Sequence, residues 1–323
     1  MSNFELDAIS KYRMELMGVS TIFILICHAA GNNVFMPKWL MYMVAQGAIG
    51  VDLFLFLSGM GLYYSLLNHS GGVILWYLKR YVRILRPYLL ITIPFGITNM
   101  LLFDESLLRV LSGISTIQYW ISHQAAWFIA LLLPLYAIAP WLYRSMRKNG
   151  LSKLIIVFCV CYGLALYPAG VSSTAFFGNV QFAIIRIPAF VLGMYMAPMI
   201  QEKKQLSYKP ILISVMAAML LMAITRKPLP SYFFLIIPVL KLLTDMLQTR
   251  IWCDRYNTML CFFGTISLES YMFNTCLPKY LHLVMDSIKI PDFGNYIFYS
   301  LVLVIGTSLA VIANRLSYIV KIK

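Results

Sequence analysis

The stretch GAIGVDLFLFLSGMG, residues 47–61, decides the fold. It belongs to an apolar run over 45–67, which is long enough to cross a bilayer as a helix of about 20 residues. Gly59 and Gly61 are small enough to allow close contact with a neighbouring helix. Asp52 is the exception, because a carboxylate at membrane depth is costly and needs a partner or a function. The stretch therefore predicts a membrane helix that carries a functional group.

Nine further apolar runs lie before and after this one in the sequence. They predict an all-α fold, a polytopic membrane helix bundle of about ten transmembrane helices in a single domain over 1–323. The polar opening of the chain lacks the early apolar region of a cleavable signal, so the first span is expected to remain in the protein. The ten predicted spans are 14–36, 45–67, 84–103, 124–143, 153–169, 181–200, 210–225, 232–248, 258–278 and 295–316.

Composition and charge agree with a membrane protein. Of 323 residues, 61% are hydrophobic and 12% charged, about half the charged fraction of a soluble domain. A net charge of +14 would suggest nucleic acid in a soluble protein. With the amino terminus inside, however, eighteen Lys and Arg fall in cytoplasmic segments and six in outer loops, as the positive-inside rule requires. We therefore expect both termini in the cytoplasm and no nucleic-acid partner. The six cysteines lack metal-ligand spacing, so no metal site is expected.

Ionisable residues within the predicted spans indicate a functional site, because such residues usually face a cavity or a partner. His28 and Asp52, on adjacent antiparallel spans, lie at similar heights, roughly 20 and 22 Å from the cytoplasmic side. If they face each other, Asp52 would fix the tautomer of the imidazole. The alternatives are a buried packing pair, or Arg186 as the partner of Asp52. The full set is His28, Asp52, Arg186, Lys241, Asp245 and Glu269.

A basic stretch, YLKRYVRILRPY at 77–88, follows the second span. Arg80, Arg83 and Arg86 recur every third residue and would lie along one flank of a helix. Arg binds phosphate through a planar fork of donors, so a phosphate site is one interpretation. Ordinary positive-inside bias is the other. Pro87 is expected to mark the beginning of the next element.

The order of these pieces resembles the acyltransferase 3 family of bacterial integral-membrane O-acyltransferases. Two positions depart from the family pattern. Met17 stands where the family has an arginine, and Arg13 lies one helical turn earlier. Asn274 stands where the family has a histidine, so proton transfer there is not expected. The pieces are RMELMGVSTIFILICH (13–28), GVDLFLFLSGMGLYYSL (50–66), YLKRYVRILRPY (77–88), AWFIALLLPLYAIAP (126–140), RIPAFVLGMYMA (186–197) and FGTISLESYMFN (263–274).

The resemblance implies transfer of an acyl group, usually acetyl, from cytoplasmic acyl-coenzyme A to a hydroxyl of a cell-surface or lipid-linked glycan. It implies a multi-pass protein of the bacterial cytoplasmic membrane, in contact with membrane lipid, and a second envelope protein as a candidate partner. A transporter or flippase for a polar solute is the alternative, although no matching half-repeats are visible. The expected site comprises His28 and Asp52 as catalytic residues, Arg13, Arg80, Arg83 and Arg86 for acetyl-coenzyme A, and Trp127, Arg186 and Glu269 for substrate or oxyanion.

Overall fold

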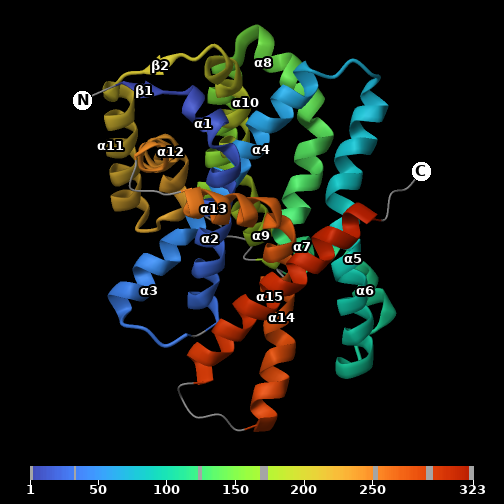
Figure 1. Cartoon of the computed structure of the whole chain (residues 1–323). Helices are drawn as coiled ribbons and strands as arrows, with labels where there is room; N and C mark the ends of the chain where they lie inside the picture. Colours follow the sequence, from blue (N-terminus) through green and yellow to red (C-terminus); the bar gives the residue numbers. More distant parts are fainter. Residues whose placement is uncertain are drawn as a thin grey trace.

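A computed structural model describes residues 3–32, 34–122, 126–167, 174–249, 254–288 and 294–319. The described chain is a bundle of helices with one small two-stranded sheet (Figure 1). The all-α helix-bundle prediction is confirmed. The sheet ties the start of the chain to residues 205–206, with Phe4 opposite Leu206.

The elements run along the chain as follows. The first group is β1 (Phe4–Glu5), α1 (Asp7–Lys11), α2 (Arg13–Gly31), α3 (Lys38–Ala45), η1 (Gln46–Ala48), α4 (Ile49–Leu67), α5 (Val73–Phe103), α6 (Leu107–Ile114) and α7 (Ile117–Ser122). The second group is α8 (Trp127–Leu166), α9 (Ala175–Ile184), α10 (Ile187–Gln201), β2 (Gln205–Leu206), α11 (Tyr208–Thr225), η2 (Leu229–Ser231), α12 (Tyr232–Gln248), α13 (Asp254–Thr265), α14 (Ser267–Ile288) and α15 (Gly294–Ile319).

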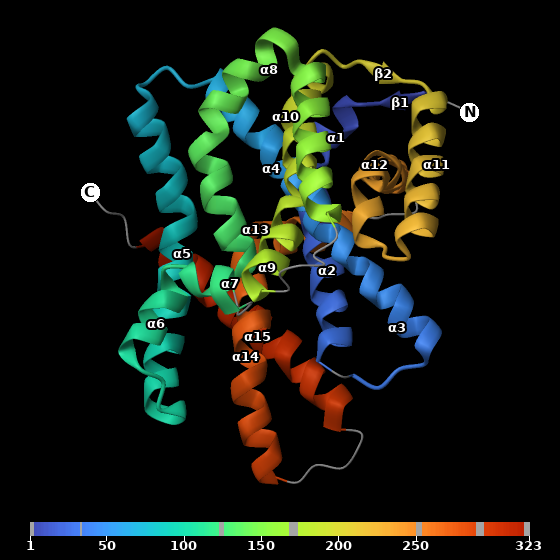
Figure 2. The same ribbon diagram turned by 180° about the vertical axis from the view of Figure 1, so that it is seen from behind.

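Eight helical segments of the described chain are long and apolar enough to cross a membrane. Two predicted spans, 124–143 and 153–169, share α8, whose backbone leaves the helical conformation at Asn149. Figure 2 shows the two arms of α8 meeting at the top of the bundle. The predicted span 258–278 is divided between α13 and α14. The predicted ends at 124 and 169 lie outside the described residues.

The expectation for Pro87 is wrong. Residues 73–103 form one helix, α5, with Pro87 and Pro94 inside it. A proline removes one backbone hydrogen bond, but neighbouring helices and Thr side chains can compensate in a membrane helix. The carbonyl oxygens that lose a partner are those of Arg83 and Leu90, four residues before each proline, whereas Thr92 and Thr98 donate to the carbonyl oxygens of Tyr88 and Pro94, at 2.7 and 2.9 Å. The basic stretch is therefore helical, and its arginines share one rigid element with the apolar part of α5.

Glycines set the closest helix contacts at the centre of the bundle. A Cβ at Gly59 would collide with the Phe190 carbonyl of α10, and one at Gly193 with the Phe56 carbonyl of α4. Gly18 of α2 approaches the backbone of Leu260 in α13 in the same way. Small residues permit such backbone contact. The close contact predicted for Gly59 is confirmed, and these contacts fix α2, α4 and α10 as the frame on which the polar residues are placed.

Candidate functional site

The structure sorts the predicted site residues into three groups. His28 forms one group with residues of α14 and α15. Asp52, Arg186 and Trp127 form a second. Arg13, Arg80 and Arg83 form a third, near Glu269.

His28 lies in the last turn of α2 and is half-buried. Its Nδ1 lies 2.5 Å from Oδ1 of Asn274, in α14. The Asn274 amide nitrogen donates to the Tyr299 hydroxyl at 3.3 Å. That hydroxyl in turn donates to the carbonyl oxygen of Leu25, one turn before His28. A chain of hydrogen bonds thus runs from α2 through α15 and α14 back to α2.

The chemistry of this chain determines the tautomer of His28. A carbonyl oxygen can only accept, so the Tyr299 hydroxyl donates to Leu25 and its oxygen accepts from the Asn274 amide nitrogen. The amide oxygen of Asn274 then faces His28, and a neutral imidazole must donate its Nδ1 proton to it. Nε2 keeps a free lone pair. An imidazole in this state is prepared to accept a proton as a general base.

Asp52 pairs with Arg186, the alternative partner considered from the sequence, and not with His28. Asp52 Oδ2 lies 2.5 Å from an Arg186 guanidinium nitrogen, and the two residues are only 3% and 2% exposed. The same nitrogen donates to the Ala48 carbonyl at 3.3 Å. The guanidinium also stacks 5.3 Å from the rings of Trp127 and Phe182. Asp52, Arg186 and Trp127 thus contact one another, through an ion pair and a cation–π interaction.

A break in the sixth predicted span brings Arg186 to Asp52. The span 181–200 is divided into α9 and α10, and Arg186 is the residue before α10. Pro188, at the first turn of α10, suits a helix start because it has no backbone N–H to satisfy. An ion pair this deeply buried must be complete, since losing either member leaves an uncompensated charge.

Arg13, Arg80 and Arg83 come together at the end of the bundle that the sequence predicts to be cytoplasmic. The three charges lie close enough to repel one another, with Tyr136 beside them. Arg13 donates to the Leu57 carbonyl, at 3.4 Å. Within the described residues none of the three forms an ion pair. The Arg80 Nε is buried and has no hydrogen-bond partner among the described residues.

The two remaining predicted residues border this cluster. Arg86 turns away from it and donates to the Ser317 carbonyl of α15 at 3.0 Å. Glu269 is buried, accepts from Asn314 at 2.9 Å and lies near enough to Arg83 for their charges to interact. Gly61 of α4 leaves the space that the Arg13 guanidinium occupies. Arg13 thus joins the predicted basic stretch, while Arg86 serves helix packing.

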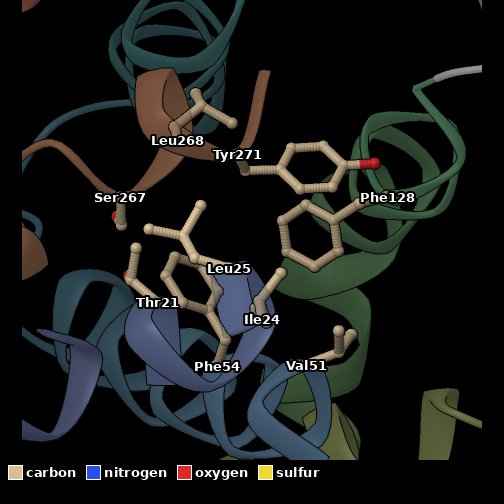
Figure 3. Close-up of a pocket in the computed structure, with 9 residues that line it drawn as sticks. All are labelled: Thr21, Ile24, Leu25, Val51, Phe54, Phe128, Ser267, Leu268 and Tyr271. Carbon is tan, nitrogen blue, oxygen red and sulfur yellow. The ribbon is translucent and has the colours of Figure 1, made fainter. Parts of the chain in front are cut away.

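A small cavity of about 20 Å³ lies among α2, α4, α8 and α14 (Figure 3). Thr21 and Leu25 line it from the side of α2 that also carries Arg13 and His28, by the helical repeat. Phe128 and Tyr271 close the side shown at the right of Figure 3, their ring centres 5.6 Å apart. The Tyr271 ring centre lies 6.3 Å from that of His28. The cavity has room for about one water molecule.

Sequence reasoning missed four residues around His28. Ser267 and Tyr271 both belong to the quoted segment FGTISLESYMFN, and both line the small cavity. That segment was the available signal. Asn274 was given no role in proton transfer, but it holds the imidazole. Tyr299 belongs to no quoted segment, so no signal in the sequence pointed to it.

Comparison with known proteins identifies the family of the chain. The family model described as an acyltransferase domain matches residues 16–315. Neither the curated proteins nor the solved structures gave a match. Membership of a family of acyltransferases favours group transfer over the transporter alternative. A match over nearly the whole chain, together with membrane-length helices, shows that this protein belongs to the acyltransferase 3 family of membrane acyltransferases.

Proposed function

We propose that the protein transfers an acyl group, acetyl in the simplest case, from acyl-coenzyme A to a hydroxyl of a cell-surface or lipid-linked glycan in a bacterial plasma membrane. The observation that carries this proposal is the state of His28. Its Nδ1 is held by Asn274 and its Nε2 is free to take a proton. General-base catalysis by a positioned imidazole contributes about 10² to 10⁴ in rate.

The arginine cluster supports the donor side of the proposal. Coenzyme A carries phosphates, and Arg binds phosphate through charge-assisted bonds. Arg13, Arg80 and Arg83 have no carboxylate ion pair within the described chain. Arg13 and His28 lie fifteen residues apart on one side of α2, or roughly 22 Å. The thin pantetheine arm would follow this side of α2 and bring the thioester to the imidazole.

The reaction follows from this placement. Nε2 of His28 takes the proton of the acceptor hydroxyl while the oxygen attacks the thioester carbonyl. The new carbon–oxygen bond forms, the carbon–sulfur bond breaks, and the proton passes from His28 to the departing sulfur of coenzyme A. Atoms and charges balance without a metal or a redox step.

The test uses the full chain in lipid nanodiscs, with radiolabelled acetyl-coenzyme A and surface glycan isolated from cells that lack the gene. We expect His28→Ala to lower transfer at least 10³-fold and to leave acetyl-coenzyme A affinity unchanged. His69→Ala is the matched control, because His69 is half-buried like His28 but lies between α4 and α5, outside the three groups of site residues, and bonds the nearby Gly72 carbonyl at 3.2 Å. Wild-type turnover in His28→Ala, or no binding of acetyl-coenzyme A by the wild type, would overturn the proposal.

A further inference from the structure

A second, much larger cavity lies where α5, α6 and α14 meet. Its volume is about 490 Å³, within the range of small-molecule sites. Figure 1 shows α6 and the lower part of α5 beside α14, toward the end of the bundle away from the strands. The sequence predicts that this end faces the outside, because Arg109 and Lys279 belong to predicted outer loops.

The lining of this cavity is mainly apolar, but it contains an organised group of polar side chains. Lys279 lies 3.0 Å from the Glu105 carboxylate and 3.0 Å from Oδ1 of Asn99. The Tyr280 hydroxyl, whose one proton lies between two acceptors, is 2.6 Å from the same Oδ1 and 3.0 Å from the Phe95 carbonyl. The Asn99 oxygen thus faces Lys279 and Tyr280, which leaves its amide N–H groups available among the described residues. Arg109 adds a guanidinium to the lining.

Aromatic rings complete the chemistry. Phe95 and Tyr280 line the cavity with ring centres 5.1 Å apart. Amide and guanidinium donors, a carboxylate acceptor and aromatic faces are what a polyhydroxylated ring needs, since its hydroxyls both donate and accept and its C–H faces are apolar.

Helix α14 relates this cavity to His28. Glu269 lies near Arg83 of the arginine cluster, Asn274 bonds His28, and Lys279 lines the cavity. These residues are five apart, so each interval is roughly 7.5 Å along the helix. The arginine cluster and the cavity therefore lie on opposite sides of His28 along one element.

The two cavities are lined by residues that are close in sequence. Tyr271 and Phe128 line the small cavity. Met272, which follows Tyr271, and Ala126, two residues before Phe128, line the large one.

We infer that the large cavity binds the acceptor, a sugar unit of a glycan, and presents its hydroxyl to His28 from the side opposite the donor. This inference rests on the proposed function and adds to it where and how the acceptor is held. The donor would reach His28 from the arginine cluster, and the acceptor from the cavity.

A pair of threonines provides a matched test. Thr92 and Thr98 are both half-buried on α5 and both donate to the carbonyl four residues earlier, but only Thr92 is among the residues lining the cavity. Thr92→Trp should fill the cavity and lower transfer to the isolated surface glycan at least tenfold, with acetyl-coenzyme A affinity unchanged. Thr98→Trp should stay within about twofold of the wild type.

A second variant tests the cavity without the risk that a bulky substitution prevents folding. Thr92→Cys is made together with Cys276→Ala, because Cys276 lines the same cavity; it is folded first and then treated with a charged, membrane-impermeant thiol reagent, with treated Cys276→Ala as the control. We expect the reagent to stop transfer only in the variant, while acetyl-coenzyme A still binds. Full transfer after modification, or equal losses for Thr92→Trp and Thr98→Trp, would overturn the inference and leave the proposed function standing. Absence of acetyl-coenzyme A binding in every protein would instead overturn the proposed function.

Discussion

The Asp52–Arg186 pair and the arginine cluster both place charge inside the bundle, but only the pair is closed. Asp52 and Arg186 are almost wholly buried and neutralise each other, and aromatic rings cover the guanidinium. The cluster gathers Arg13, Arg80 and Arg83 without a carboxylate ion pair in the described chain. Removing one member of a buried ion pair leaves an uncompensated charge, whereas gathered like charges repel one another and attract an anion. We therefore interpret the pair as structural and the cluster as the proposed donor site.

The largest expected effect comes from opening the closed pair. Asp52→Asn leaves the Arg186 charge buried and unpaired, which costs about 3–5 kcal/mol of unfolding free energy. Unfolding by SDS titration measures the loss. Asp245→Asn is the control, because its partner Lys241 lies 2.7 Å away but the carboxylate side chain is 51% exposed, and exposed pairs contribute about 0–1 kcal/mol.

The double variant Asp52→Leu with Arg186→Met sharpens this test, because an apolar pair avoids the unpaired charge and should recover most of the stability. A different result would reverse the interpretation. If Asp52→Asn is as stable as the wild type but inactive, Asp52 acts on His28 as its matching height suggested.

The second effect concerns Asn274, which gives His28 its tautomer. Asn274→Leu removes the acceptor for the Nδ1 proton, so turnover should fall by roughly 10², with acetyl-coenzyme A affinity unchanged. Tyr299→Phe removes only the group that orients the amide, and its loss should be smaller. Imidazole ¹⁵N spectra, with His28 assigned by His28→Gln, should show the Nδ1-protonated form in the wild type and a tautomer mixture in Asn274→Leu. An unchanged tautomer with lowered stability would make Asn274 a packing residue.

The sequence predicted the helices better than the pairings, for a physical reason. A membrane requires long apolar helices, so hydropathy alone located the spans. Helical rise also put His28 and Asp52 at similar depth. Which side chains meet depends on helix rotation and on breaks such as the one before Ile187, and a linear pattern contains neither. The partners lie 134 residues apart for Asp52 and Arg186, and 246 for His28 and Asn274.

The arginine cluster was partly predictable because three of its candidates are close in sequence. The three-residue spacing placed Arg80, Arg83 and Arg86 on one flank, but it could not show that Arg86 bonds α15. Arg13 entered only as a substitute for the family arginine at position 17. The large cavity was not predictable, because α5, α6 and α14 bring its lining together from distant segments.

The third effect tests the open cluster. Arg80→Gln and Arg83→Gln should each weaken acetyl-coenzyme A binding about tenfold, as the loss of one charge-assisted hydrogen bond implies. Stability should not fall, because each change removes repulsion between like charges. Arg86→Gln is the control on the same helix, and its affinity should match the wild type. Calorimetric titration at two salt concentrations measures both the affinity and its electrostatic part; equal affinities for all three variants would reduce the cluster to a topology signal.

The smallest effect distinguishes two glycines of α4 that lie two residues apart. A Cβ at Gly61 would meet only the end of the Arg13 side chain, which can move, so Gly61→Ala should keep the fold and shift the guanidinium. We expect acetyl-coenzyme A affinity to fall roughly threefold, a fraction of one charge-assisted bond. A Cβ at Gly59 would meet the Phe190 backbone, which cannot move alone, so Gly59→Ala should lower the unfolding midpoint instead. If Gly61→Ala also loses stability and its affinity is unchanged, then Arg13 supports helix packing and only Arg80 and Arg83 remain to hold the donor.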